Sequence, residues 1–140
     1  MKLYLDTSFI LAVVIDDAHS ENARRRWDVI STGAVVSNLA SLEFSAVVSR
    51  GVRMKALTND GARTALDDFD LICASCRSYA LSGADFELAL RLVRDFSTKL
   101  ATPDALHLAS AINLEASLAT FDARLKEAAE MRGVRVVELG

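Results

Sequence analysis

The sequence predicts an α/β fold in which a mainly parallel central sheet is flanked by helices. Short apolar segments alternate along the chain with longer segments whose apolar residues recur at helical spacing, an arrangement typical of repeated strand–helix units. Several short segments, such as Leu3-Tyr4-Leu5, are almost wholly apolar, as expected of strands that helices cover on both faces. No internal repeat or linker interrupts this alternation, and the single proline stands where a helix is expected to begin.

Length and composition favour one domain. The chain has 140 residues, 51% hydrophobic and 25% charged, which is enough to bury a substantial core, so we expect residues 1–140 to form one domain. The net charge of −3 is not that of a protein whose whole surface binds nucleic acid, although it allows a local basic patch. The apolar run Phe9 to Ile15 is far below the roughly 20 residues of a membrane span. We therefore expect a cytoplasmic protein.

The first half of the chain is predicted to contain two strands and three helices. In order, we expect a strand at 2–5, a helix at 8–15, a helix from residue 20, a strand at 34–37 and a helix at 38–50. Asn38 is a residue type that caps helices, and Gly51 is of the type that ends them. The apolar residues of that last helix predict its buried stripe: Ala40, Phe44, Val47 and Val48.

The second half is predicted to continue the alternation. In order, we expect a helix at 58–71, a short strand at 78–81, helices at 83–96 and from residue 102, a strand at 118–121, a helix at 123–132 and a closing strand at 134–138. Ser82 and Asp85 form a capping-box pattern. Thr102-Pro103-Asp104 combines a capping residue, a proline at the first helical position and an acid in the first turn. The helix at 83–96 is predicted to turn these residues inward: Phe86, Leu90 and Val93, with Ala89 beside them.

Four carboxylates lie where predicted strands or helices begin or end: Asp6, Glu43, Asp104 and Asp122. Asp6 and Asp122 follow buried strands, and the carboxyl ends of parallel strands line the crevice where ligands bind. If the four converge there, the best reason to gather them is a hard cation such as Mg²⁺ or Mn²⁺. Three also have purely structural explanations, since Asp122 suits an N-cap, Asp104 suits a first helical turn and Glu43 suits a solvated helix edge.

The two cysteines, Cys73 and Cys76, form a Cys-Ala-Ser-Cys spacing that is compatible with a redox or zinc pair. A zinc site needs two more ligands, and His19 and His107 are the only histidines. A redox pair normally opens a helix after a strand, whereas this pair follows a long helical stretch. We interpret both cysteines as small, half-buried structural residues.

Taken together, the motifs resemble the PIN-domain family, and specifically the VapC-type toxins of bacterial toxin–antitoxin pairs. The resemblance covers nearly the whole chain. It rests on these segments, in order and at sensible spacing: Leu5-Asp6-Thr7-Ser8, Ser41-Leu42-Glu43-Phe44 with Arg50, Pro103-Asp104-Ala105-Leu106-His107-Leu108-Ala109, Thr120-Phe121-Asp122 and Gly133-Val134-Arg135-Val136. The chain keeps all four acidic positions of the family pattern.

The resemblance implies a three-layer PIN-like sandwich and a Mg²⁺-dependent endoribonuclease, in which Mn²⁺ could substitute. It also implies a cognate VapB-type antitoxin whose tail covers the acidic site, a toxin homodimer and a toxin–antitoxin hetero-oligomer. Metal chemistry lowers the pKa of bound water and clamps the phosphate. A positive antitoxin side chain, such as arginine, could neutralise the same acids and take the place of the metal.

Roles follow for individual residues on this interpretation. Asp6 and Asp104 are expected to be the main metal ligands, with Glu43 and Asp122 completing the site directly or through water. Small hydroxyl residues are expected to orient ligands or contact phosphate: Thr7, Ser8 and Thr120. Basic residues are expected to contact the RNA backbone: Arg50, Arg53 and Lys55.

Other functions stay open at this point. A metal-independent ribonuclease could use His19 and His107 as acid and base. A phospho-receiver-like signalling module also gathers acids around Mg²⁺, but it needs adjacent acids after the first strand, and here Asp6 precedes Thr7-Ser8. A catalytically inert PIN-like binding module is the remaining alternative. The sequence identifies neither the RNA nor the number of metal ions.

Overall fold

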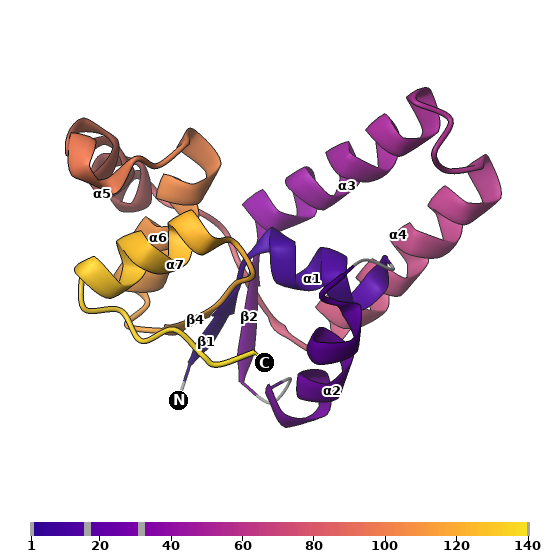
Figure 1. Ribbon diagram of the computed structural model, residues 1–140, viewed down its shortest axis with the longest axis horizontal. Coiled ribbons are helices and arrows are strands. Elements are labelled where there is room, and N and C mark those ends of the chain that lie inside the picture. The colour runs from indigo at the N-terminus through magenta and orange to yellow at the C-terminus, as the bar shows by residue number, and fades with distance from the viewer. Residues whose placement is uncertain (1, 16–17, 31–32, 140) are drawn as a thin grey trace.

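The computed structural model describes residues 2–15, 18–30 and 33–139. Figure 1 shows a central sheet with α1–α4 on one side and α5–α7 on the other, which confirms the predicted three-layer arrangement. The elements in chain order are β1 (Leu3–Leu5), α1 (Thr7–Val14), α2 (Ser20–Ile30), β2 (Ala34–Ser37), α3 (Asn38–Arg53), α4 (Asn59–Ala74), β3 (Arg77–Tyr79), α5 (Gly83–Arg94), the 3-10 helix η1 (Phe96–Thr98), α6 (Thr102–Asn113), β4 (Ser117–Ala119) and α7 (Ala123–Met131). None of the described helices is long and apolar enough to cross a membrane.

The sheet has the strand order β3-β2-β1-β4, and every neighbouring pair is parallel. The chain therefore builds outward from β1 through β2 to β3 and then returns to the other side of β1 with β4. Such a reversal is a topological switch point, and a crevice opens there at the carboxyl ends of the two strands. Here the switch point lies between β1 and β4, directly before Asp6 and Thr120.

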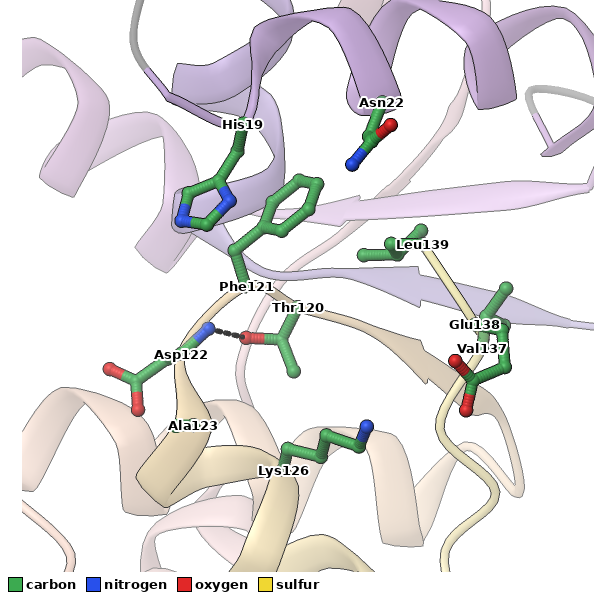
Figure 2. A pocket seen from close by; sticks show the side chains of 10 residues that line it. All are labelled: His19, Asn22, Thr120, Phe121, Asp122, Ala123, Lys126, Val137, Glu138 and Leu139. Carbon is green, nitrogen blue, oxygen red and sulfur yellow. Dashed lines mark hydrogen bonds between the residues drawn. The ribbon is translucent and has the colours of Figure 1, made fainter.

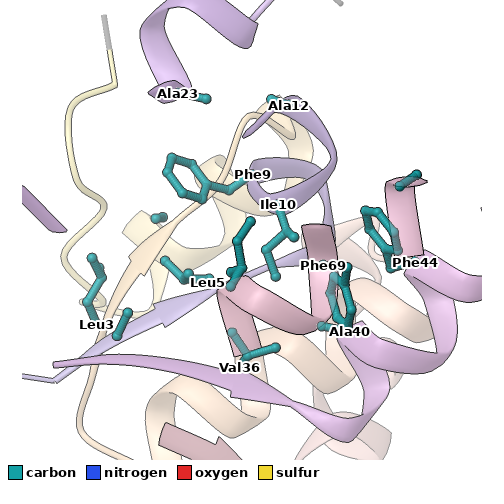
Figure 3. Packing of buried hydrophobic residues seen from close by; sticks show 14 of the residues in the cluster. Leu3, Leu5, Phe9, Ile10, Ala12, Ala23, Val36, Ala40, Phe44 and Phe69 are labelled. Carbon is teal, nitrogen blue, oxygen red and sulfur yellow. The ribbon is translucent and has the colours of Figure 1, made fainter. Parts of the chain in front are cut away.

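Alternation along β1 divides the molecule into two cores. Leu3 and Leu5 point toward the layer of α1–α4, whereas Tyr4 points into the layer of α5–α7, as the period of a strand requires. Figure 3 shows the first core, where Leu5 and Val36 of the sheet pack against Phe9 and Ile10 of α1. The rings of Phe44 and Phe69 stack with centroids 4.4 Å apart and join α3 to α4.

The predicted closing strand at 134–138 is wrong for the part of the chain that the structure describes. The segment forms one isolated bridge, between Leu118 and Val136. Two backbone hydrogen bonds hold it, from Leu118 N to Arg135 O and from Val137 N to Leu118 O, both 2.9 Å long. Both hydrogen bonds involve Leu118, so the C-terminal segment pairs with β4 at one residue only and does not form a strand. The predicted strand at 118–121 likewise ends earlier, at Ala119.

Helix α3 differs from its prediction at both ends. Its N-cap is Ser37, whose Oγ accepts the Ala40 N–H at 3.1 Å, while Asn38 Oδ1 accepts the N–H of Leu81. Gly51 lies inside the helix, and a Cβ atom there would come within 2.8 Å of Leu57 Cδ1. Its role is close packing of the turn between α3 and α4. Val47, predicted to be buried, is 43% exposed.

Helix α5 turns a different face inward than its apolar residues predict. Phe86, Leu90 and Val93 are exposed at 57%, 52% and 40%, and the buried face carries Asp85, Ala89 and Leu92. The physical reason is the Asp85 carboxylate, which is fully buried and accepts hydrogen bonds from Tyr79 Oη (2.5 Å), Asn113 Nδ2 (2.7 Å) and the Ser82 N–H (2.8 Å). Those bonds fix the rotation of the helix. The capping role predicted for Asp85 is confirmed.

The remaining helix starts agree closely with prediction. Thr58 caps α4 through Gly61 N, and Asp122 caps α7 through Leu125 N. Helix α6 begins one residue earlier than predicted, with Ala101 rather than Thr102 at the N-cap. Asp104 keeps its predicted place in the first turn. Cys73 and Cys76 are free and half-buried at the end of α4, which agrees with their interpretation as structural residues.

Candidate metal-binding acidic site

Asp6 leaves β1 at the switch point and caps α1. It is 3% exposed, and its oxygens accept hydrogen bonds from Ser8 Oγ (2.8 and 3.0 Å), Thr120 Oγ1 (2.5 Å) and the Phe9 N–H (3.0 Å). Burial raises the pKa of Asp6, and the hydrogen bonds, led by that from Thr120, oppose the shift. The carboxylate is thus held in one orientation by α1 and by the residue after β4.

Glu43 of α3 is held by a histidine. His107 Nε2 lies 2.5 Å from Glu43 Oε1, and Thr7 Oγ1 donates to the same oxygen at 2.7 Å. Burial acts to raise the pKa of Glu43, but the hydrogen bond and charge of His107, with the bond from Thr7, outweigh burial and lower it. Glu43 is therefore ionised at neutral pH, so Nε2 carries the proton that it donates.

The other nitrogen of His107 is also engaged. Nδ1 lies 2.6 Å from the hydroxyl of Tyr4, which itself donates to Ser37 Oγ at 2.9 Å. Burial raises the pKa of Tyr4, so the hydroxyl keeps its proton. A buried chain of contacts therefore runs from the N-cap of α3, through β1 and α6, back to Glu43 on α3.

Asp104 and Asp122 are held much more loosely. Both are partly exposed, and within the described residues Asp104 accepts no side-chain hydrogen bond, while Asp122 accepts one, from Leu125 N at 2.9 Å. Burial, followed by the charge of Asp122 and then those of Asp6 and Glu43, raises the pKa of Asp104 to about 6, against the opposing charge of His107. Asp104 is therefore close enough to the other three predicted carboxylates to be repelled by their charges.

The donor chemistry fits a hard divalent cation. All four side chains offer carboxylate oxygens, and the repulsion at Asp104 marks a place where positive charge is favoured. Among the described residues, no three Asp, Glu, His or Cys side chains are grouped closely enough to hold one ion together. The four acids therefore do not form one compact ligand cluster within the described residues, and a Mg²⁺ ion here would take one or two carboxylates directly and keep several waters.

The supporting residues divide into two groups. Thr7, Ser8 and Thr120 each hydrogen bond an acid of the site. Arg50, Arg53 and Lys55 lie toward the far end of α3, on a two-helix arm that Figure 1 shows extending away from the sheet with α4. Ten residues separate Glu43 from Arg53, or about 15 Å along a helix. These basic residues do not lie beside the acids.

The hydrogen-bonding role of His107 brings together parts of the chain that are far apart in the sequence. The visible signal was its position one turn after Asp104, but its contacts depend on β1 and α3, which lie far away in sequence. His19, the other histidine, is exposed and stacks on Phe121 with ring centroids 4.4 Å apart. An acid–base pair of these histidines is disfavoured, because His107 is 2% exposed and both of its nitrogens are engaged.

The fold and the acids at its switch point define a class of α/β protein with a parallel sheet and a candidate site at the carboxyl ends of its strands. A family model of the PIN domain matches residues 3–131. The chain therefore belongs to the PIN-domain family, which confirms the family resemblance of its motifs.

Solved structures share this fold at low sequence identity. The chain is similar to the sarcin-ricin loop cleaving toxin VapC20 of Mycobacterium tuberculosis, with a TM-score of 0.74, 21% identity and coverage of 91% of this chain and 95% of that one. It is also similar to a chain of the DNA-bound VapBC of Salmonella typhimurium, with a TM-score of 0.76, 13% identity and coverage of 100% and 99%. The chain is similar as well to a chain of FitAcB from Neisseria gonorrhoeae, with a TM-score of 0.71 and 19% identity. That match covers 97% of this chain and 96% of the other. No curated protein sequence matches the chain significantly.

Proposed function

We propose that the protein is a metal-dependent endoribonuclease and the toxin of a toxin–antitoxin pair. The observation that carries the proposal is the environment of Asp104 in a PIN domain, where burial and then the charges of Asp122, Asp6 and Glu43 raise its pKa to about 6. A fold gains no stability from such repulsion, so a cationic ligand is the reason to keep it.

In this proposal Asp6 and Asp104 bind the metal, and Glu43 and Asp122 complete the site directly or through water. Bound Mg²⁺, or Mn²⁺ in its place, supplies a more acidic water and stabilises charge on the phosphate. Thr120 and Ser8 keep Asp6 aimed at the site through hydrogen bonds of 2.5 and 2.8 Å. His107 and Thr7 do the same for Glu43.

The toxin role includes a VapB-type antitoxin as partner. It is supported by the fold shared with VapBC and FitAcB complexes. An antitoxin cation, such as an arginine guanidinium, placed between Asp104 and Asp122 would relieve the same repulsion that a metal relieves. The proposal also includes a toxin homodimer and a larger toxin–antitoxin assembly, both measurable by light scattering of the purified species.

The test uses antitoxin-free protein incubated with total bacterial RNA in Mg²⁺, Mn²⁺ or EDTA. Asp6→Ala and Asp104→Ala are compared with Asp67→Ala, which removes an exposed acid of α4. We expect cleavage that requires metal, leaves 5′-phosphate and 3′-hydroxyl ends, disappears in the two site variants and persists in Asp67→Ala.

Other outcomes identify the competing functions. Cleavage that survives EDTA and both site variants contradicts the metal mechanism. No cleavage with either metal indicates an inert binding module, provided that mass spectrometry shows no residual antitoxin. Labelling by acetyl phosphate identifies a phospho-receiver.

A further inference from the structure

A pocket of about 290 Å³ opens beside the acidic site, and its lining is shown in Figure 2. Its walls come from the segment after β4, from α2 with the residue before it, from α7 and from the C-terminal segment. We propose that this pocket binds one unpaired nucleobase of the RNA, adjacent to the phosphate that is cleaved. The inference rests on the proposed nuclease function and deepens it.

The outer two rings of an aromatic ladder, Phe121 and His19, line one side of the pocket. Phe9, Phe121 and His19 stack in sequence from the core to the surface, with centroids 5.9 and 4.4 Å apart and interplanar angles of 8° and 15°. Phe9 is fully buried, so the ladder is anchored in the first core. Unpaired bases are recognised by stacking on aromatic side chains, and a preassembled stack adds a base at little entropic cost.

Three polar side chains of different kinds line the rest of the pocket. Figure 2 shows the Asn22 amide, the Lys126 ammonium and the Glu138 carboxylate around one opening. Within the described part of the chain, none of the three makes a side-chain hydrogen bond or ion pair with another residue. An ammonium suits a backbone phosphate, whereas an amide and a carboxylate suit the edge of a base. Because a carboxylate only accepts, Glu138 favours bases that carry an exocyclic amino group, which are adenine, guanine and cytosine, over uracil.

The pocket is joined to the acids by a single tripeptide. Thr120 donates to Asp6 at 2.5 Å, Phe121 belongs to the ladder, and Asp122 belongs to the site and to the pocket wall. A second pocket, lined by Asp104, Asp122 and Arg124, lies on the other flank of Asp122. An RNA strand crossing Asp122 therefore has one nucleotide over each pocket, with the phosphate between them near the acids.

This continuity favours RNA over a protein side chain as the occupant. A partner that only covers the acids has no need of a ring stack anchored in the core. A nuclease that cuts at a preferred base needs such a stack beside its scissile phosphate. The volume of about 290 Å³ accommodates a planar base with room for water.

The test compares pocket variants with matched controls outside the pocket. His19→Ala removes the outer ring, Lys126→Met removes the ammonium but keeps the chain length, and Glu138→Gln converts an acceptor-only group into one that also donates. Phe96→Ala removes an exposed ring at 87% exposure, and Lys2→Met removes an exposed ammonium at the amino end of β1. The ends produced from a random-sequence RNA pool give base preference, and a single preferred oligomer gives kcat and KM.

We expect His19→Ala and Lys126→Met to raise KM about 10-fold with little change in kcat and to weaken the base preference next to the cut. Glu138→Gln should shift which base is preferred. The two controls should behave like wild type. Unchanged KM and unchanged base preference in all three pocket variants would overturn the inference while leaving the nuclease function intact.

A binding measurement separates failure of the pocket from failure of the nuclease. Fluorescence anisotropy of six-nucleotide RNAs is measured with the Asp6→Asn protein alone and combined with His19→Ala or Lys126→Met. Weaker binding in both double variants supports the pocket even if wild type cleaves no RNA. Loss of binding to a co-expressed antitoxin, with RNA binding and cleavage unchanged, overturns the inference and makes the pocket a partner site.

Discussion

The acidic site has two unlike halves. Asp6 and Glu43 are both held by hydrogen bonds from other residues, and we call them the hydrogen-bonded pair. Together they accept bonds from the side chains of Ser8, Thr120, Thr7 and His107 and from one backbone N–H. Asp104 and Asp122, the open pair, together accept one bond within the described residues, from Leu125 N. The difference teaches that the protein itself orients one half, whereas the other half is left to be satisfied by what binds.

The largest effect is expected when the hydrogen-bonded pair loses a charge. Asp6→Asn keeps the N-cap acceptor but removes a metal-binding charge, so we expect RNA cleavage to fall at least about 1,000-fold, or about 4 kcal/mol of transition-state stabilisation. Single-turnover cleavage in saturating Mg²⁺ measures it. A loss under 10-fold, with the melting temperature unchanged, would place the reaction elsewhere.

A smaller loss is expected when only the orientation of the hydrogen-bonded pair is disturbed. His107→Gln removes the ring that joins Tyr4 to Glu43, and we expect kcat to fall about 10- to 100-fold, the usual cost of losing a ligand-orienting partner. In a titration with Mg²⁺, the variant should need a higher Mg²⁺ concentration than wild type to reach half of its maximal rate. Tyr4→Phe removes only the hydroxyl that contacts His107 Nδ1 and leaves the contact between His107 Nε2 and Glu43, so its kcat should fall less. Circular dichroism shows whether each variant is folded.

Thr120→Val probes the hydrogen-bonded pair more gently. The substitution keeps the shape of the side chain but removes the hydroxyl that donates to Asp6 at 2.5 Å, leaving one carboxylate oxygen with Ser8 alone. We expect a loss of about 1–2 kcal/mol in unfolding free energy and a fall in cleavage of about 10-fold. Urea unfolding and cleavage rates check the two effects. Thr58→Val, which removes the N-cap hydroxyl of α4, should cost stability only.

The smallest effect concerns the open pair and appears in stability. The pKa of Asp104 is raised from 3.8 to about 6, so its protonated form favours the fold. This contribution is complete below about pH 4 and is lost as pH rises through 6. We expect metal-free Asp104→Asn to exceed wild type by about 1 kcal/mol at pH 7, a value reduced for partial solvation, and to match it near pH 4.

Urea unfolding at both pH values in EDTA measures this difference, with Asp67→Asn as the exposed control. Saturating Mg²⁺ should then stabilise wild type and not Asp104→Asn. A pH-independent difference between the two proteins would contradict the raised pKa of Asp104.

Much of the fold and part of the acidic site could be predicted from the sequence, because helix caps, helix starts and strand–helix alternation depend on residues close together in the chain. The strand–helix alternation, the N-cap at Asp122 and the acid in the first turn of α6 were all confirmed. What failed depended on contacts that the helical pattern itself does not show, and some of these are made with residues far away in the chain. Gly51 was assigned to a helix end, yet Leu57 explains it, and the ring of His107 gains its meaning from Tyr4 and Glu43.

Helix α5 shows the same limit in reverse. Its apolar spacing predicts a buried face of Phe86, Leu90 and Val93, but a polar residue one position away decides the outcome. Hydrophobic periodicity ranks faces by transfer free energy and does not see that a buried carboxylate can be fully satisfied by residues of β3 and α6.

That carboxylate also acts as a rotational latch. Successive residues of a helix are about 100° apart, so Asp85 and Phe86 mark two competing orientations of α5. With the latch closed, three large apolar side chains face outward. Asp85→Leu would release it and let the helix roll by roughly that angle, hiding the apolar stripe. A single buried carboxyl therefore sets how much apolar surface α5 exposes to its surroundings.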